Sequence, residues 1–117
     1  MSKHAALIIK GRVISKKNNV RYSRGFTYKT KAWRAFESSV LAQLEGTRAR
    51  FSGKVDITYY FKMKGCLDSD IDNAISAISD LLEKAGIIDN DKNVVSLTAA
   101  KEGGHKEWIT EVEITSV

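Results

Sequence analysis

The apolar and polar positions along the chain alternate with two different periods, which predict where strands and helices lie. In residues 54–63 every second residue is apolar or aromatic, the pattern of a strand with one buried face. Residues 31–45 and 74–85 repeat their apolar positions every three or four residues, as an amphipathic helix does. Thr30 is a suitable N-cap for the first of these helices, and Gly86 is a suitable end for the second.

Shorter apolar runs predict three further strands and complete the order of elements. They cover residues 5–14, 93–99 and 108–115, with a turn at residues 101–106 between the last two. The segment 15–29 follows neither period and is expected to be a surface loop or a hairpin. This order contains no repeated βαβ unit and predicts an α+β fold. We expect a single small domain with a mostly antiparallel or mixed sheet and two main helices packed against it.

Composition agrees with one globular domain. A chain of 117 residues is long enough for a single core and too short for two. No apolar run approaches the roughly 20 residues of a membrane-spanning helix, and the first residues lack the length and cleavage site of a signal peptide. Cys66 is the single cysteine, so no disulfide forms within the chain. We therefore expect a cytoplasmic protein with no membrane partner.

Charge is distributed unevenly along the chain. Residues 1–64 contain fifteen lysines and arginines against three acidic residues, whereas residues 65–117 contain four against eleven. Within residues 15–29 the basic residues alternate with aromatic ones, so cations can reach phosphates while rings stack on exposed bases. Two interpretations stay open. The two halves pair with each other, in one chain or across a dimer, or a phosphate-binding surface lies beside a metal site, which explains both halves at once.

Seven acidic residues lie between residues 67 and 95, most of them near the two ends of the second predicted helix. Asp70 and Asp72 precede the regular helical pattern, and an extended backbone there would point both carboxylates to one side. Asp91 follows the helix and would have to fold back to meet them. Clustered carboxylates repel unless a cation or a shared proton offsets their charge, and oxygen-only ligands favour Mg²⁺ or Mn²⁺. For any one of these residues, a helix cap or a turn is an equally good interpretation.

Residue types exclude two other kinds of metal site. The segment that starts at Asp89 resembles a calcium-binding EF-hand loop, but Val94 stands where glycine is needed and Ala100 where glutamate is needed. The segment that starts at Asp68 fails in the same way. One cysteine and two distant histidines provide no zinc ligand set.

The acidic segment resembles a family signature. The motifs D-I-D-N at residues 70–73, K-A-G at 84–86 and D-K-N-V at 91–94 are similar to the pattern of the RusA family of Holliday junction resolvases. In that family D-x-D-N precedes a helix of about a dozen residues, which is followed by D-x-x-V. Residues 15–18 and 31–37 are similar to the N-terminal part of phage-borne members. The resemblance thus covers most of the chain and implies one RusA-like endonuclease domain.

This resemblance implies a homodimeric, Mg²⁺-dependent endodeoxyribonuclease, with Mn²⁺ as a substitute, that nicks a four-way DNA junction symmetrically. Asp70, Asp72 and Asp91 would be its metal-binding and catalytic carboxylates, because a bound metal ion activates water and stabilises the transition state. Two sites related by a twofold axis match the symmetry of a junction. The protein would work in the host cytosol if a virus or prophage encodes it. The residues expected to bind DNA are Lys16, Lys17, Asn18, Arg21, Arg24, Lys29, Lys31, Asn73 and Ser76.

Position 76 departs from the family pattern. Members commonly have a lysine one helical turn after the second aspartate, and here this residue is Ser76. A lysine would stack over Asp72 and hold the scissile phosphate or offset the carboxylate charge, and serine does neither. Either another cation substitutes, from Lys92, Lys101 or a second subunit, or turnover is slow. Two alternatives therefore stand beside the nuclease: a non-catalytic branched-DNA-binding protein of the same fold, and a structural dimer whose basic and acidic halves pair.

Overall fold

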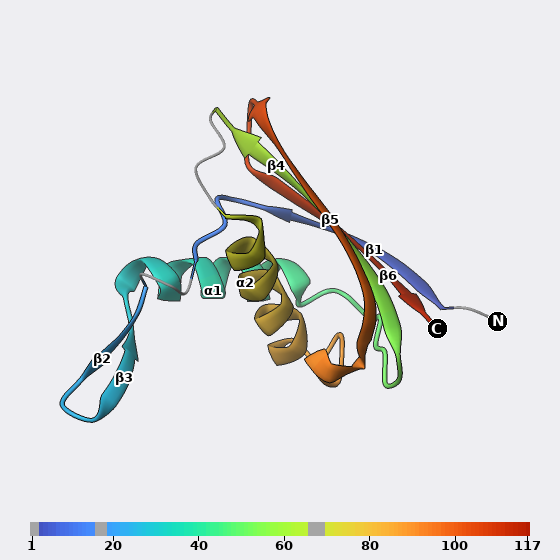
Figure 1. The fold of residues 1–117 in the computed structure, drawn as a ribbon, viewed down its shortest axis with the longest axis horizontal. Helices are drawn as coiled ribbons and strands as arrows, with labels where there is room; N and C mark the ends of the chain where they lie inside the picture. Colours follow the sequence, from blue (N-terminus) through green and yellow to red (C-terminus); the bar gives the residue numbers. More distant parts are fainter. Residues whose placement is uncertain (1–2, 16–18, 66–69) are drawn as a thin grey trace.

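A four-stranded mixed sheet forms the centre of the fold, and a two-stranded hairpin projects away from it (Figure 1). The computed structural model describes residues 3–15, 19–65 and 70–117, and for residues 20–23 it describes the main chain alone. In chain order the elements are β1 (His4–Lys10), β2 (Val20–Ser23), β3 (Phe26–Lys29), α1 (Lys31–Leu44), β4 (Val55–Lys64), α2 (Ile71–Lys84), the short 3₁₀ helix η1 (Asp91–Asn93), β5 (Val94–His105) and β6 (Ile109–Ser116).

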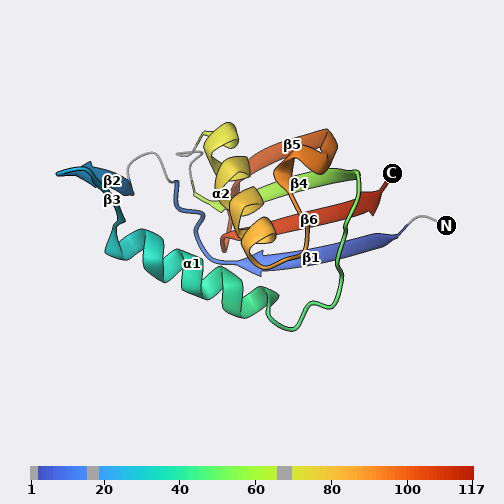
Figure 2. The same cartoon turned by 90° about the horizontal axis from the view of Figure 1, so that it is seen from below.

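The order of strands in the sheet is β1-β6-β4-β5. β6 is antiparallel to both β1 and β4, whereas β4 and β5 are parallel. Parallel neighbours need a crossover connection, and α2 is that connection between β4 and β5. α2 therefore runs back along the sheet, from the end of β4 towards the start of β5 (Figures 1 and 2). The predicted α+β class with a mixed sheet is confirmed.

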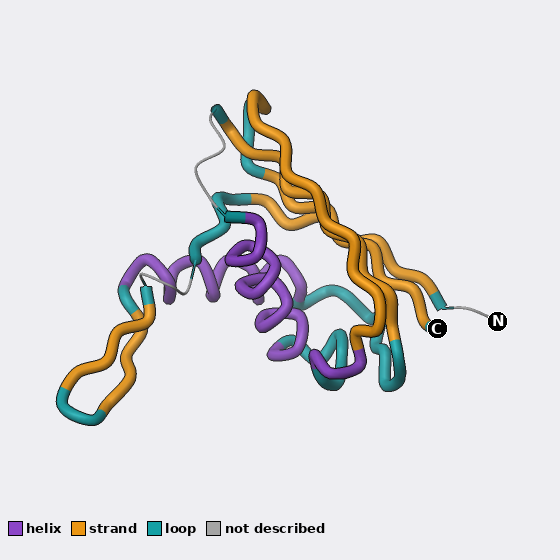
Figure 3. Tube along the Cα trace, viewed as in Figure 1, coloured by secondary structure: helices purple, strands orange, loops and turns teal. Residues whose placement is uncertain are grey.

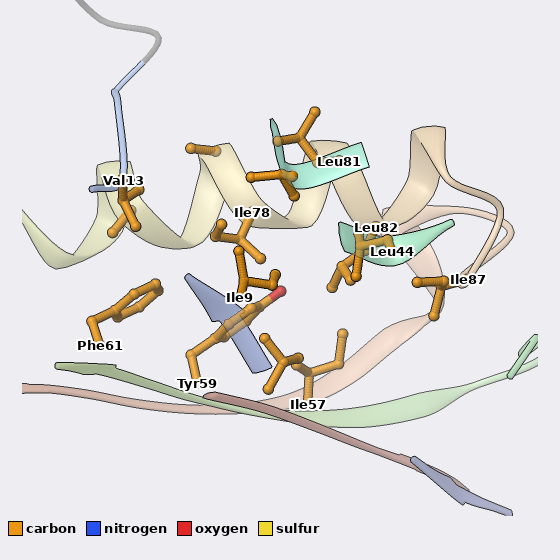
Figure 4. Close-up of a cluster of buried hydrophobic side chains, with 14 of the residues drawn as sticks. Ile9, Val13, Leu44, Ile57, Tyr59, Phe61, Ile78, Leu81, Leu82 and Ile87 are labelled. Carbon is orange, nitrogen blue, oxygen red and sulfur yellow. The ribbon is translucent and has the colours of Figure 1, made fainter. Parts of the chain in front are cut away.

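Both helices cover the same face of the sheet, and the core lies between the two layers (Figures 1 and 3). The predicted alternation in β4 is confirmed, because Val55, Ile57, Tyr59, Phe61 and Met63 are all buried. Figure 4 shows the β4 side chains packed against those of α2 and β1. On α1 the predicted N-cap is also confirmed, since Thr30 Oγ1 accepts a hydrogen bond from the backbone N–H of Trp33 at 3.2 Å. In the described part of the chain, no helix is long and apolar enough to cross a membrane.

Two strand boundaries differ from the prediction by more than one residue. β1 ends at Lys10 rather than Ile14, because Gly11 has a φ of 117° that interrupts the extended backbone. β5 continues to His105, through the two glycines that predicted a turn. Its hydrogen bonds with β4 extend to the pair Lys64 and His105, so pairing in the sheet outweighs the low strand propensity of glycine.

Tyr59 connects β4 to α2 inside the core. Its hydroxyl lies 2.6 Å from Ser79 Oγ. Burial raises the pKa of Tyr59 to about 12, although the hydrogen bond with Ser79 acts in the opposite direction. An unfolded tyrosine has a pKa of about 10. Tyr59 therefore stabilises the fold fully below pH 10, and this contribution is lost as the pH rises towards 12.

We expect Tyr59→Phe to lower the free energy of unfolding near neutral pH by about 1 kcal/mol, because Ser79 loses its partner. The variant should also lose less stability than the wild type between neutral pH and about pH 11. Urea unfolding at both pH values measures the two effects. Tyr28→Phe is the control, because Tyr28 is exposed on the hairpin. A Tyr59→Phe protein as stable as the wild type at both pH values would contradict this role.

Candidate active site

The N-terminal end of α2 carries two of the predicted carboxylates. Asp70 is the N-cap, with an extended backbone (φ −70°, ψ 137°), and Asp72 lies in the first turn. The helix thus begins at Ile71, so the extended backbone through Asp72 that the sequence allows is not present. An aspartate at this position usually caps the helix through its side chain, but the Asp70 side chain makes no capping hydrogen bond. Its carboxylate is exposed.

Asn73 contacts both carboxylates. Its side-chain Nδ2 lies 3.4 Å from Asp70 Oδ2, and its backbone N–H donates to Asp72 Oδ1 at 2.9 Å. The first turn of a helix also presents free N–H groups and the positive end of the helix dipole, which favour nearby negative charge. Asn73 therefore contacts two exposed carboxylates, and the helix terminus offsets part of their negative charge.

Asp91 lies at the opposite end of α2, as Figure 1 shows by the distance between the yellow start of the helix and the orange η1. Its backbone N–H donates to Glu83 Oε2 at 3.2 Å, which holds this segment against the last turn of α2. A helix of 14 residues is about 21 Å long. Among the described residues, no three His, Cys, Asp or Glu side chains come close enough to hold a metal ion. One chain therefore does not bring Asp91 to Asp70 and Asp72.

A pocket of about 400 Å³ lies between α2 and the start of β5. It contains Asp91 and also Ser76, which is exposed on α2 one turn after Asp72. Position 76, where the family pattern has a lysine, therefore faces the same space as Asp91. The residues that line the pocket are Ser76, Ser79, Asp80, Asp91, Val94, Val95, Ser96 and Leu97.

The hairpin of β2 and β3 projects from the body next to the start of α1 (Figures 1 and 2). Its two turn residues, Arg24 and Gly25, both have positive φ values of 50° and 83°, as a type I′ turn requires. Phe26 and Tyr28 are 74% and 50% exposed, and their spacing places them on one face of the strand. The segment 15–29 thus contains a hairpin. Two β-favouring runs separated by two residues, the second a glycine, are the signal that indicates it.

Other predicted DNA contacts lie near this hairpin. Arg24 is exposed in the turn, Lys31 is exposed at the first position of α1, and Arg21 belongs to β2. Lys29 ends β3, and its Nζ lies 3.0 Å from Glu37 Oε2. The predicted contacts Lys16, Lys17 and Asn18 lie outside the described residues, as do Asp68 and Cys66.

Glu37 is a feature of this region that the sequence analysis missed. Burial raises its pKa, but hydrogen bonds from Lys84 and Lys29 outweigh that effect and hold the pKa below its ordinary value of 4.5. Two features of the sequence indicate that Glu37 has partners. It is one of only three acidic residues among the fifteen basic ones of residues 1–64, and it lies one helical turn after Trp33.

The comparison with known proteins gives one family. A family model described as endodeoxyribonuclease RusA matches residues 10–115, which include the hairpin, both helices and all three aspartates. No curated protein matches the chain. The match confirms the resemblance of the motifs around α2. The chain therefore belongs to the RusA family of endodeoxyribonucleases, enzymes that act on branched DNA and resolve Holliday junctions.

Proposed function

We propose that this protein is a divalent-metal-dependent resolvase that makes paired nicks in a four-way junction, and that two copies of the chain build each catalytic site. The observation that carries the proposal is the position of the three aspartates. Asp70 and Asp72 share one end of α2, whereas Asp91 lies at the other end. A site that uses all three carboxylates therefore needs a second chain.

The donor atoms suit a hard divalent cation. Asp70, Asp72 and Asp91 are exposed and offer oxygen ligands, which Mg²⁺ and Mn²⁺ prefer. Asp70 and Asp72 of one copy would hold the ion from one side, and Asp91 of the second copy would complete the set. A bound ion would activate a water molecule and stabilise the charge that develops on the scissile phosphate. Asn73 keeps Asp70 and Asp72 in place through its two contacts.

β5 offers the surface for pairing two copies. It is an outer strand of the sheet and is 12 residues long. A long free edge presents unpaired backbone groups, which favour addition of another strand. Val95 and Leu97 at the start of β5 are 52% and 45% exposed. Burial of these apolar side chains would stabilise the pair.

Antiparallel pairing of two β5 edges across a twofold axis would complete the site. In such a pair, the start of one β5 lies beside the end of the other. Asp91 lies just before the start of β5, whereas Asp70 and Asp72 follow β4 at the end of the sheet where β5 also ends. Pairing would therefore carry Asp91 of each copy towards Asp70 and Asp72 of the other. The twofold symmetry would place two equivalent sites on two strands of a junction.

The hairpin and the start of α1 supply a surface suited to DNA. Arg24 and Lys31 are exposed cations that can bind phosphates. Phe26 and Tyr28 expose their rings on one face of the hairpin, where an unpaired base can stack on them. A branch point contains distorted, partly unpaired bases, so this combination favours a junction over a continuous duplex.

Cleavage of a labelled four-way junction, compared with a linear duplex of the same sequence, tests this function. We expect paired symmetric nicks in the junction with Mg²⁺ and none with EDTA. Asp70→Asn should reduce nicking at least about a hundredfold without weakening junction binding, because substituting only an outer-shell partner of a metal site already costs up to about a hundredfold. Asp89→Asn is the matched control, because Asp89 is an exposed carboxylate outside the proposed site.

The two alternatives give different outcomes in the same experiment. Tight junction binding without nicks would favour a non-catalytic DNA-binding protein. The presence of Ser76 where the family pattern has a lysine supports this alternative. Weak binding that salt does not affect would favour a structural dimer, because phosphate contacts always weaken as salt rises.

A further inference from the structure

One carboxylate connects the hairpin, α1 and α2. Glu37 Oε2 accepts hydrogen bonds from Lys29 Nζ at 3.0 Å and from Trp33 Nε1 at 3.3 Å. Glu37 Oε1 accepts one from Lys84 Nζ at 2.9 Å. Lys29 is the last residue of β3 and Lys84 is the last residue of α2. Glu37, on α1, therefore bridges the base of the hairpin to the last turn of α2.

This bridge is better shielded than an ordinary surface ion pair. The side chain of Glu37 is 16% exposed, although those of Lys29 and Lys84 are 40% and 50% exposed. The buried Trp33 orients the carboxylate through its indole N–H. A pocket of about 370 Å³ lies among the same residues, between α1 and α2. Ion pairs, rather than apolar packing alone, therefore span the gap between the helices at this point.

Asn19 provides a different kind of attachment for the hairpin. Its carbonyl oxygen accepts from Thr30 N at 2.8 Å, its side-chain oxygen accepts from Thr30 Oγ1 at 2.9 Å, and its Nδ2 donates to Ser15 O at 2.8 Å. These bonds close the base of the hairpin and join it to the start of α1. These bonds do not reach α2, whereas the hydrogen bonds of Glu37 connect the base of the hairpin to that helix.

The same turn of α2 also holds the segment with Asp91. Glu83 accepts a hydrogen bond from the backbone N–H of Asp91, and Lys84 is the next residue along the helix. The hairpin and Asp91 are thus anchored to neighbouring residues of one helical turn. The contacts of Glu37 and of Asp91 therefore meet on this one turn of α2.

We infer that Glu37 is a positioning residue that sets the direction of the β2–β3 hairpin relative to α2, and so places DNA held by the hairpin against Asp91. The part of this inference that concerns DNA rests on the proposed function. The direction of the hairpin is a property of the free protein and can be measured without DNA or metal.

A distance measurement between two spin labels on the free protein tests the inference. In a Cys66→Ser background, the labels are placed at Thr27→Cys on the hairpin and at Glu113→Cys on β6, both exposed positions. We expect a narrow distribution of distances in this protein. Glu37→Gln keeps the size of the side chain but removes the charge, so it should broaden the distribution. Glu45→Gln, at an exposed glutamate at the end of the same helix, is the control and should leave it unchanged.

Junction affinity gives a second measurement. We expect Glu37→Gln to raise the Kd for a four-way junction about tenfold, a typical size for coupling between two parts of a protein. Lys84→Met removes the contact with α2 and keeps the one with Lys29, so it should broaden the distances too, and it replaces Glu37→Gln if that variant does not fold. An unchanged distribution would overturn the inference, as would weaker binding without broadening. If Glu37→Gln broadens the distances but the wild-type protein binds no junction, the positioning role is supported and the proposed function is refuted.

Discussion

Mixing the Asp70→Asn and Asp91→Asn variants is expected to restore junction cleavage that neither variant has alone. In a dimer with one copy of each, one proposed site combines the intact Asp70 of one chain with the intact Asp91 of the other. The second site carries both substitutions and is inactive. If each site came from a single chain, both sites of the mixed dimer would be damaged and no activity would return.

The size of the recovery follows from simple counting. Equal amounts that exchange subunits freely form about one half mixed dimers, and each mixed dimer has one intact site of two. The mixture should therefore nick at about a quarter of the wild-type rate, against a loss of at least about a hundredfold for either variant alone. On a plasmid with an extruded cruciform, the mixed dimer should produce nicked circles, whereas the wild type should produce linear molecules.

A matched mixture controls this experiment. Asp70→Asn mixed with Asp72→Asn places both substitutions at the same end of α2, so each site of the mixed dimer is damaged and activity should not return. Subunit exchange is verified with a tagged copy. Absence of recovery in the first mixture, despite verified exchange, would rule out sites shared between two copies.

Ser76→Lys is expected to raise the rate of nicking about tenfold, as a well-placed charge near a reacting phosphate does. Ser76 is exposed and lines the same pocket as Asp91. A lysine there lies within one helical turn of Asp72 and Asp80, so it can offset their charge and hold a phosphate. Single-turnover cleavage of a four-way junction in Mg²⁺ measures the change.

Ser76→Met is the control for Ser76→Lys, because methionine has a long side chain without a charge. An unchanged rate in Ser76→Lys would mean that another cation already performs this role. Lys92 and Lys101 are then the residues to substitute, since both are carried by the elements that follow α2. A rate of nicking raised equally by Ser76→Lys and Ser76→Met would show that the charge is not the cause.

Local sequence patterns were sufficient for the elements whose burial repeats regularly. β4 alternates along its whole length and is buried as predicted, and α1 begins at its predicted cap, Thr30. The same patterns missed the course of β5 through Gly103 and Gly104, because its hydrogen bonds come from β4, far away in the chain. Periodicity records which face of an element is buried, and it contains no information about which strand lies beside it.

The same distinction applies to the candidate site. The sequence alone identified Asp70, Asp72 and Asp91 as candidate metal-binding carboxylates, and it indicated the family that the comparison confirms. Only the tertiary structure decided that Asp91 does not fold back to the other two, because α2 runs between the parallel strands β4 and β5 and the last turn of α2 holds Asp91. Only the tertiary structure likewise brought Lys84 to Glu37, since contacts between residues 47 positions apart depend on how the elements pack.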